Sequence, residues 1–173
     1  MISFRRVTRE DFPLLSAWLA EPHNRRWWNH DPDTVEADFA AAVDGREPSE
    51  DWLALDDGVP FGLLQRQRWV DYPDEARTLE PVVTPGARDY GIDYLIGRAS
   101  ATGRGMGTEM ISAFCLLTFG ELDADAVIVA VAAGNRRSWR ALERAGFTRV
   151  GEVDMSPDNP IDPPDHVVDQ LRR

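Results

Sequence analysis

The segment from residue 90 to residue 119 constrains the fold of this chain more than any other. A short apolar run at residues 92–96 leads into the loop Gly103-Arg104-Gly105-Met106-Gly107. Glycines let a ligand approach the backbone closely, and the free N–H groups of a first helical turn attract negative charge. The pattern therefore predicts a strand, a glycine-rich turn and a helix that together bind an anion. One buried helix face is predicted by apolar residues at helical spacing, namely Met110, Ile111, Phe114, Cys115 and Leu117.

Two common phosphate-binding patterns do not fit this loop. A dinucleotide-binding fold would need a glycine where Thr108 stands. A P-loop would continue into a Gly-Lys-Ser or Gly-Lys-Thr triplet, which does not follow here.

Length and composition limit the number of domains and the class of protein. With 173 residues, we expect a single domain over residues 1–173 with a substantial core. The sequence lacks an apolar run of the roughly 18 residues that a transmembrane helix needs, and its start does not match a signal peptide. We therefore expect a soluble, cytoplasmic protein without a membrane partner or a metal site. Cys115 is the only cysteine, and its place on the apolar helix face predicts a core thiol.

The net charge of −11 is unevenly distributed along the chain. Residues 1–97 carry 19 acidic and 10 basic side chains, whereas residues 98–149 carry 5 acidic side chains and 7 arginines. This division fits an anionic ligand at the glycine loop and a cationic one elsewhere. An acidic surface that only maintains solubility is the alternative. The excess of acid disfavours nucleic acid, which requires basic patches.

The remaining pattern predicts alternating strands and helices. Thr8 and Asp11 form a capping pattern for a helix that Pro22 ends, and Asp56-Asp57-Gly58 forms a hairpin turn. Strands are predicted at residues 2–7, 52–55, 60–69, 92–96, 126–132, 148–153 and 166–171. Further helices are predicted at residues 34–43 and 135–145, and residues 23–33, 44–50, 71–88 and 156–164 are predicted to be turns or loops.

The glycine loop resembles the pyrophosphate-binding signature of the GNAT N-acetyltransferases, (Gln/Arg)-x-x-Gly-x-(Gly/Ala). Gly105 and Gly107 are its glycines, and Thr102 stands in place of Gln or Arg. Residues 135–147 resemble the family element in which an Asn opens a helix that ends in Ala-Gly-Phe. The resemblance implies an α/β (α+β) GNAT fold. Its central sheet is mixed, mostly antiparallel and flanked by helices, and its fourth and fifth strands splay apart to form the cofactor cleft.

The same resemblance implies acetyl-CoA as the co-substrate. Its pantetheine arm would pair with the strand backbone, its pyrophosphate would meet the loop amides, and arginines, including Arg136 and Arg137, would meet its phosphates. The residues expected to contact it are Leu95, Ile96, Gly97, Gly103, Arg104, Gly105, Met106, Gly107, Thr108 and Asn135.

A closer resemblance is to the aminoglycoside 6′-N-acetyltransferases that carry a Gly-Ile-Asp motif, here Gly91-Ile92-Asp93. It implies that Asp93 accepts the proton of the substrate amine and that Trp27 and Trp28 line the sugar site. We also expect Asp71 and Asp74, in an acidic loop, to bind the cationic substrate. The resemblance thus implies an antibiotic-resistance acyltransferase that acts as a monomer or homodimer.

The chemistry agrees with this role for Asp93. An amine must be neutral to attack a thioester, yet it is mostly protonated at pH 7. A carboxylate at the amine holds the cation and accepts its proton. A carboxylate with only a structural role is the alternative.

One residue departs from the family pattern. Leu142 stands where the family usually places a Tyr, the possible acid for the leaving thiolate. This absence favours one alternative, a CoA-binding module without catalysis. A second alternative is a siderophore-type N-acyltransferase for lysine or hydroxylysine, a relative with the same sheet and glycine loop.

Overall fold

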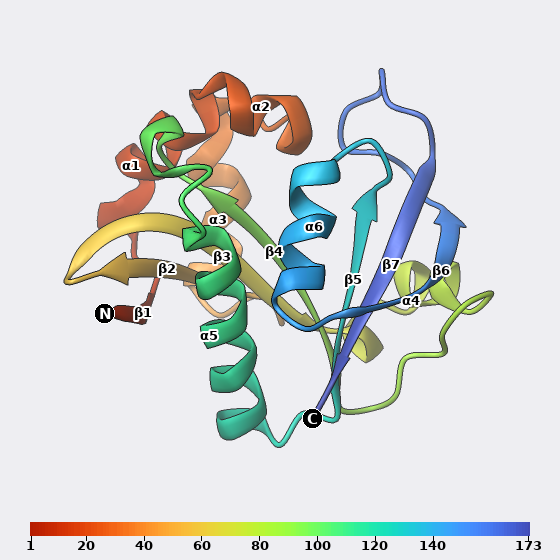
Figure 1. Ribbon diagram of the computed structural model, residues 1–173. Coiled ribbons are helices and arrows are strands. Elements are labelled where there is room, and N and C mark those ends of the chain that lie inside the picture. Colours follow the sequence, from red (N-terminus) through yellow and green to blue (C-terminus); the bar gives the residue numbers. More distant parts are fainter. The chain divides into compact units, whose positions relative to one another are not determined.

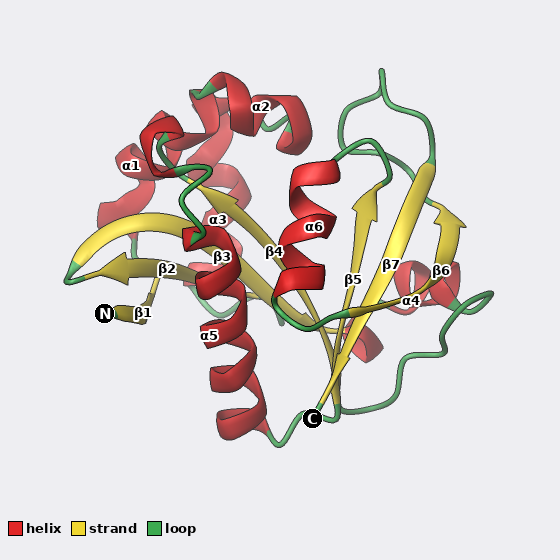
Figure 2. Ribbon diagram, in the orientation of Figure 1, coloured by secondary structure: helices red, strands yellow, loops and turns green.

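The computed structural model describes all 173 residues except the side chain of Pro32. The chain forms two compact units, residues 1–66 with 93–110 and residues 67–92 with 111–173. Strand β4 (Asp89–Ile96) and helix α5 (Met106–Leu122) contribute to both units. Figure 1 labels the elements along the chain, and Figure 2 separates helices from strands.

The first unit contains a meander of antiparallel strands. β1 (Ile2–Arg6) pairs with β2 (Glu50–Asp56), which pairs with β3 (Val59–Arg68). Asp57 and Gly58 join β2 to β3 with φ values of 47° and 83°. Two positive φ angles are what a two-residue hairpin turn requires, so the predicted turn is confirmed.

Three short helices precede the β2–β3 hairpin, namely α1 (Phe12–Ala20), α2 (Pro22–Trp28) and α3 (Val35–Val43). The 3-10 turn Arg9–Asp11 leads into α1, and there the Asp11 carboxylate accepts hydrogen bonds from the backbone N–H and hydroxyl of Thr8. A bidentate contact from Arg5 is the main cause that lowers the pKa of Asp11. The helices bury apolar side chains with the strands, including Leu15, Trp18, Leu19, Phe39, Leu53, Leu63 and Leu95.

The second unit contains the other strands. β5 (Ala126–Ala132) pairs with β7 (Asp165–Arg172), which pairs with β6 (Thr148–Asp154), both antiparallel. β4 pairs with β5 in parallel at its first residues, Asp89 with Ala126 and Tyr90 with Val127. Helix α6 (Arg136–Arg144) precedes β6. The core of this unit contains Trp69, Leu79, Ala126, Ile128, Val153 and Val168.

The strands follow the order β1-β2-β3-β4-β5-β7-β6. With one parallel pair among antiparallel ones, the predicted mixed, mostly antiparallel α/β architecture is confirmed.

Cys115 is a buried thiol of α5, and burial raises its pKa to about 12. Among the described residues, no helix is long and apolar enough to cross a membrane. The single domain and the separation of β4 from β5 stay predictions.

Two predicted loops are instead partly helical. Residues 23–28 lie in α2, and residues 71–88 contain the end of the 3-10 turn Trp69–Asp71 and α4 (Pro73–Leu79). Pro22 and Pro73 are the first residues of their helices, where the missing N–H costs nothing and the fixed φ angle favours the helix. The acidic residues Asp74 and Glu75 then occupy the first turn of α4, where the helix dipole stabilises negative charge.

Candidate functional site

The catalytic candidate Asp93 lies in β4 and is exposed to solvent. Its neighbours Ile92 and Leu95 are buried, with 2% and 5% of their surface exposed. The strand therefore fixes the backbone of Asp93 in the core and leaves its side chain accessible. This is the arrangement that a carboxylate needs to meet a ligand.

The glycine loop follows β4 after the 3-10 turn Ala99–Ala101, and its last two residues, Met106 and Gly107, begin α5. Gly103 and Gly105 have φ angles of 76° and 84°, in the region that favours glycine. Glu109 N–H donates to the carbonyl of Gly105 at 3.1 Å, so the helical bonding begins there. The N–H groups of the first turn of a helix have no partner inside the helix. The expected strand, turn and helix are confirmed, and they give backbone donors suited to an anion.

The side chains of the loop differ in exposure. Arg104 is exposed, and Met106, Gly107 and Thr108 are half-buried. A side chain added at Gly103 or Gly105 would meet no atom within 4 Å, whereas one at Gly107 would reach only Ile96, at 4.0 Å. The loop therefore has space at its glycines.

The end of β4 is held firmly within the first unit. Gly97 N–H donates to the Phe61 carbonyl at 2.8 Å. The indole of Trp18 lies directly against Gly97, where an added Cβ would be 2.1 Å from the ring. Leu95 belongs to the buried cluster of this unit, and Ile96 is half-buried.

Two neighbouring residues of α2, His23 and Asn24, contact this strand end, and no role was predicted for them. His23 Nε2 lies 2.8 Å from the carbonyl oxygen of Ile96, and Asn24 Nδ2 lies 3.1 Å from it. Asn24 also donates to the carbonyls of Gly97 and Trp18, at 3.3 and 2.8 Å. The helix that carries the two predicted substrate tryptophans is thus bonded to the strand that carries Asp93.

The two tryptophans have different surroundings. Trp28 packs against the buried cluster of the first unit, and its ring centroid lies 5.8 Å from that of His30. Trp27 is half-buried, with the guanidinium of Arg26 4.0 Å from its ring centroid. Trp28 therefore has a packing role, while Trp27 stacks with a cation.

The other candidates lie in the second unit. Asp71 accepts two hydrogen bonds from Arg68 at 2.9 Å, and Asp74 pairs with Arg77 at 3.0 Å on the surface of α4. Both carboxylates are thus neutralised by neighbouring arginines on the chain.

Asn135 caps α6 as predicted, because its side chain accepts a hydrogen bond from Ser138 N–H at 3.3 Å. Gly146 follows that helix with a φ of 95°, as expected for a residue after a helix end. Leu142 is fully buried, so its position in α6 is part of the packing and offers no proton.

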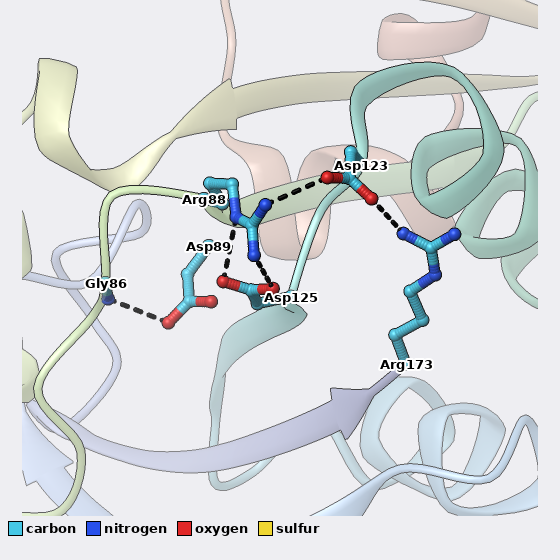
Figure 3. Close-up of polar contacts among 6 residues, drawn as sticks. All are labelled: Gly86, Arg88, Asp89, Asp123, Asp125 and Arg173. Carbon is cyan, nitrogen blue, oxygen red and sulfur yellow. Dashed lines mark hydrogen bonds and ion pairs between the residues drawn. The ribbon is translucent and has the colours of Figure 1, made fainter.

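The start of β4 lies beside a polar network of the second unit (Figure 3). Arg88 pairs with Asp125 at 2.6 Å and with Asp123 at 2.8 Å, and Arg173 also pairs with Asp123. Asp89 is buried and accepts a hydrogen bond from Gly86 N–H at 2.8 Å.

An open pocket of about 510 Å³ is lined by Thr84, Gly86, Asp89, Asp125, Arg172 and Arg173. None of the predicted site residues lines it. Within the part of the chain that the structure describes, no group of His, Cys, Asp and Glu is arranged to hold a metal ion.

Comparison with known proteins identifies similar chains. The profile of the acetyltransferase (GNAT) domain matches residues 7–155. Aminoglycoside N(6′)-acetyltransferase type 1 of Klebsiella pneumoniae is 29% identical over 164 residues, which cover 92% of this chain and 79% of the relative. The kanamycin resistance protein of Rhizobium radiobacter is 35% identical over 98 residues, or 57% of this chain and 80% of the relative.

A solved structure has the same fold as this chain. The aminoglycoside acetyltransferase AAC(6′)-Ib, in complex with coenzyme A and kanamycin, superimposes with a TM-score of 0.83 at 25% identity. The match covers 100% of this chain and 95% of that one.

Proposed function

Because this chain belongs to the GNAT acetyltransferase family, we propose that it transfers the acetyl group of acetyl-CoA to an amine of an aminoglycoside, at the 6′ position. The observation that carries the proposal is that β4, with Asp93 exposed, continues within one compact unit into the glycine loop and the start of α5. The similar proteins named for aminoglycoside acetylation and kanamycin resistance support the choice of acceptor.

The acetyl-CoA site in this proposal uses the end of β4 and the loop after it. The pantetheine arm runs along the strand end at Leu95, Ile96 and Gly97, where the Ile96 carbonyl and the Gly97 N–H are already bonded within the chain, and the loop amides from Gly103 to Thr108 meet the pyrophosphate. The positive φ angles of Gly103 and Gly105 and the start of a 17-residue helix support this use. Arg104 and Asn135 complete the proposed contacts.

The acceptor is held by Asp93 in this proposal, with Trp27 against its sugar ring. Asp71 and Asp74 stay predicted contacts, and each is paired with an arginine of the chain. Asp93 binds the ammonium group and takes its proton, which leaves a lone pair on the nitrogen. The nitrogen attacks the thioester carbonyl carbon, and the tetrahedral intermediate collapses as the carbon–sulfur bond breaks. The products are the amide and CoA, whose sulfur leaves with the bonding electron pair and gains one of the two hydrogens left on the nitrogen as a proton, while the other stays on the amide.

No acid is assigned to the leaving sulfur, because Leu142 is buried and apolar. A thiolate is a good leaving group, so turnover does not depend on such an acid. We further propose a cytoplasmic location and a role in aminoglycoside resistance. The state of assembly, monomer or homodimer, stays a prediction.

A substrate panel tests the acceptor. Release of free CoA is measured with kanamycin, with tobramycin and with N6-hydroxylysine, each at saturating acetyl-CoA. The proposal predicts turnover with the two aminoglycosides. Turnover with N6-hydroxylysine alone would favour the siderophore-type reaction, and CoA binding without turnover would favour a binding module.

Replacement of Asp93 tests the base. Asp93→Asn keeps size and polarity but cannot take a proton, so kcat for kanamycin should fall by about 10²–10⁴. The loss should shrink at high pH, where free amine is abundant, and acetyl-CoA binding should barely change. A variant that turns over at the wild-type rate would move the base elsewhere.

A further inference from the structure

The carbonyl group of Ile96, the last residue of β4, is bonded by two side chains. Its oxygen lies 2.8 Å from His23 Nε2 and 3.1 Å from Asn24 Nδ2. A carbonyl oxygen has two lone pairs, so these two contacts match its accepting capacity. Both come from α2, which is more than 70 residues away along the chain.

The opposite edge of the same peptide group is also bonded. The N–H of Gly97 donates to the Phe61 carbonyl in β3 at 2.8 Å. The N–H and C=O of a trans peptide point in opposite directions, so β3 and α2 hold this plane from its two sides. Trp18, which is 2% exposed, closes the space above Gly97. The peptide between Ile96 and Gly97 therefore has one orientation.

His23 is the hydrogen-bond donor in its contact with the Ile96 carbonyl. A carbonyl oxygen only accepts, so Nε2 carries the hydrogen and donates it. The other ring nitrogen, Nδ1, lies 3.9 Å from Oε2 of Glu21, which is beyond hydrogen-bond reach. His23 therefore acts on the Ile96 carbonyl as a hydrogen-bond donor.

A short, bonded segment connects this peptide to the glycine loop. The N–H groups of Ala101 and Thr102 donate to the carbonyls of Arg98 and Ala99, at 3.0 and 3.1 Å. Gly103 and Gly105 follow at once, before α5 begins at Met106. Because these hydrogen bonds hold the turn, we expect a rotation at Gly97 to shift the amides of the glycine loop.

We propose that His23 is a positioning residue for acetyl-CoA, which orients the Ile96–Gly97 peptide and thereby the glycine loop. The inference rests on the proposed function only through the use of acetyl-CoA. It assigns His23 no contact with the acceptor and no proton transfer.

Three variants separate the hydrogen bond from the shape of the ring. His23→Phe keeps a ring and lacks the donor, His23→Asn has a donor that is too short to reach, and His23→Gln has a donor of similar reach. CoA affinity is measured by titration calorimetry without acceptor, together with Tm and the KM for acetyl-CoA. The loss of one hydrogen bond predicts about three- to tenfold weaker CoA binding and a raised KM in the Phe and Asn variants. The Gln variant should stay within about twofold of the wild type.

His30→Phe is the matched control, because His30 follows α2 and contacts Asp38, at 3.4 Å. It should leave CoA affinity unchanged. The proposal is overturned if His23→Phe binds CoA like the wild type, or if all three His23 variants lose affinity equally. Weak CoA binding in the Phe and Asn variants supports it even if no aminoglycoside is acetylated, so the two proposals fail separately. A wild-type protein that does not bind CoA would overturn both.

Discussion

The two ends of β4 are held by different kinds of interaction. Its last residues are bonded by the side chains of His23 and Asn24, and Asn24 is only 4% exposed. Its first residues lie beside Arg88, Asp123 and Asp125, whose side chains are 55%, 69% and 53% exposed. Water and salt screen exposed ion pairs, whereas a buried hydrogen bond has no substitute when one partner is lost. We infer that the end of β4 depends on its hydrogen bonds to α2, whereas the ion pairs beside its start contribute little to stability.

Asn24→Asp should produce the largest loss of stability. Asn24 Nδ2 faces three carbonyl oxygens, those of Trp18, Ile96 and Gly97. A carboxylate there would be buried and repelled by all three, so we expect a loss of about 3–5 kcal/mol in the free energy of unfolding at pH 7. Urea denaturation measures it. Asn135→Asp is the control, because Asp caps a helix as well as Asn. Equal stability of the two variants would contradict the specific role of the strand end.

Asp51→Asn should change stability in the opposite direction. Asp51 is 3% exposed, and its burial raises its pKa to about 6 from 3.8. The folded state therefore holds this proton more tightly than the unfolded state, and stability is lost as pH rises from about 4 through 6. The Asn variant should be more stable at pH 7, by up to about 3 kcal/mol.

The pH profile of this difference is the check. Below pH 3.8 the carboxyl is protonated in both states, so the difference in free energy of unfolding that comes from its ionisation should disappear. In the wild type, Gln65 Nε2 donates to Asp51 Oδ1 at 2.9 Å. The Asn variant keeps an Oδ1 atom, so this hydrogen bond should remain. A difference that does not depend on pH would mean that the charge of Asp51 is not the cause.

Gly97→Ala should cost about 1–3 kcal/mol, because its Cβ would overlap the Trp18 ring in a packed core. Gly120→Ala is its counterpart, since Gly120 lies in α5 with no atom within 4 Å of an added Cβ. That change should stabilise the helix by about 0.5–1 kcal/mol. Thermal denaturation of both variants should give shifts of opposite sign, and shifts of the same sign would count against the tight packing at Gly97.

Arg88→Ala should have the smallest effect. It removes the partner of Asp123 and Asp125, but all three side chains are at the surface. The variant should be slightly less stable at low salt, and the difference should fade at about 0.5 M NaCl. A loss as large as that of Gly97→Ala, or one that salt does not change, would erase the contrast between the two strand ends.

Local patterns predicted most of the elements. The hairpin at Asp57-Gly58, the cap at Asn135 and the glycine after α6 were all correct, because turn and cap chemistry depends on residues close in sequence. The two short helices α2 and α4 were missed for a related reason. Pro22 was taken as the end of a helix and residues 71–88 as a loop, although Pro22 and Pro73 each begin a helix.

The contacts of His23 and Asn24 with Ile96 had no such local signal. They join residues more than 70 positions apart, and no periodicity or spacing indicates which carbonyl a side chain reaches. The glycine loop and the strand before it were predicted because they are continuous in sequence. The roles of Asp93 and the other predicted site residues stay predictions.

Analysis of the product formed from acetyl-CoA and kanamycin tests the central claim most directly. The purified protein is incubated with both, released CoA is quantified, and the acetylated position is located by NMR. The account predicts one acetyl group per released CoA, on the 6′ amine, and no acetylation of an aminoglycoside with a hydroxyl in its place. CoA release no faster than without acceptor, or acetylation at another amine, would contradict it.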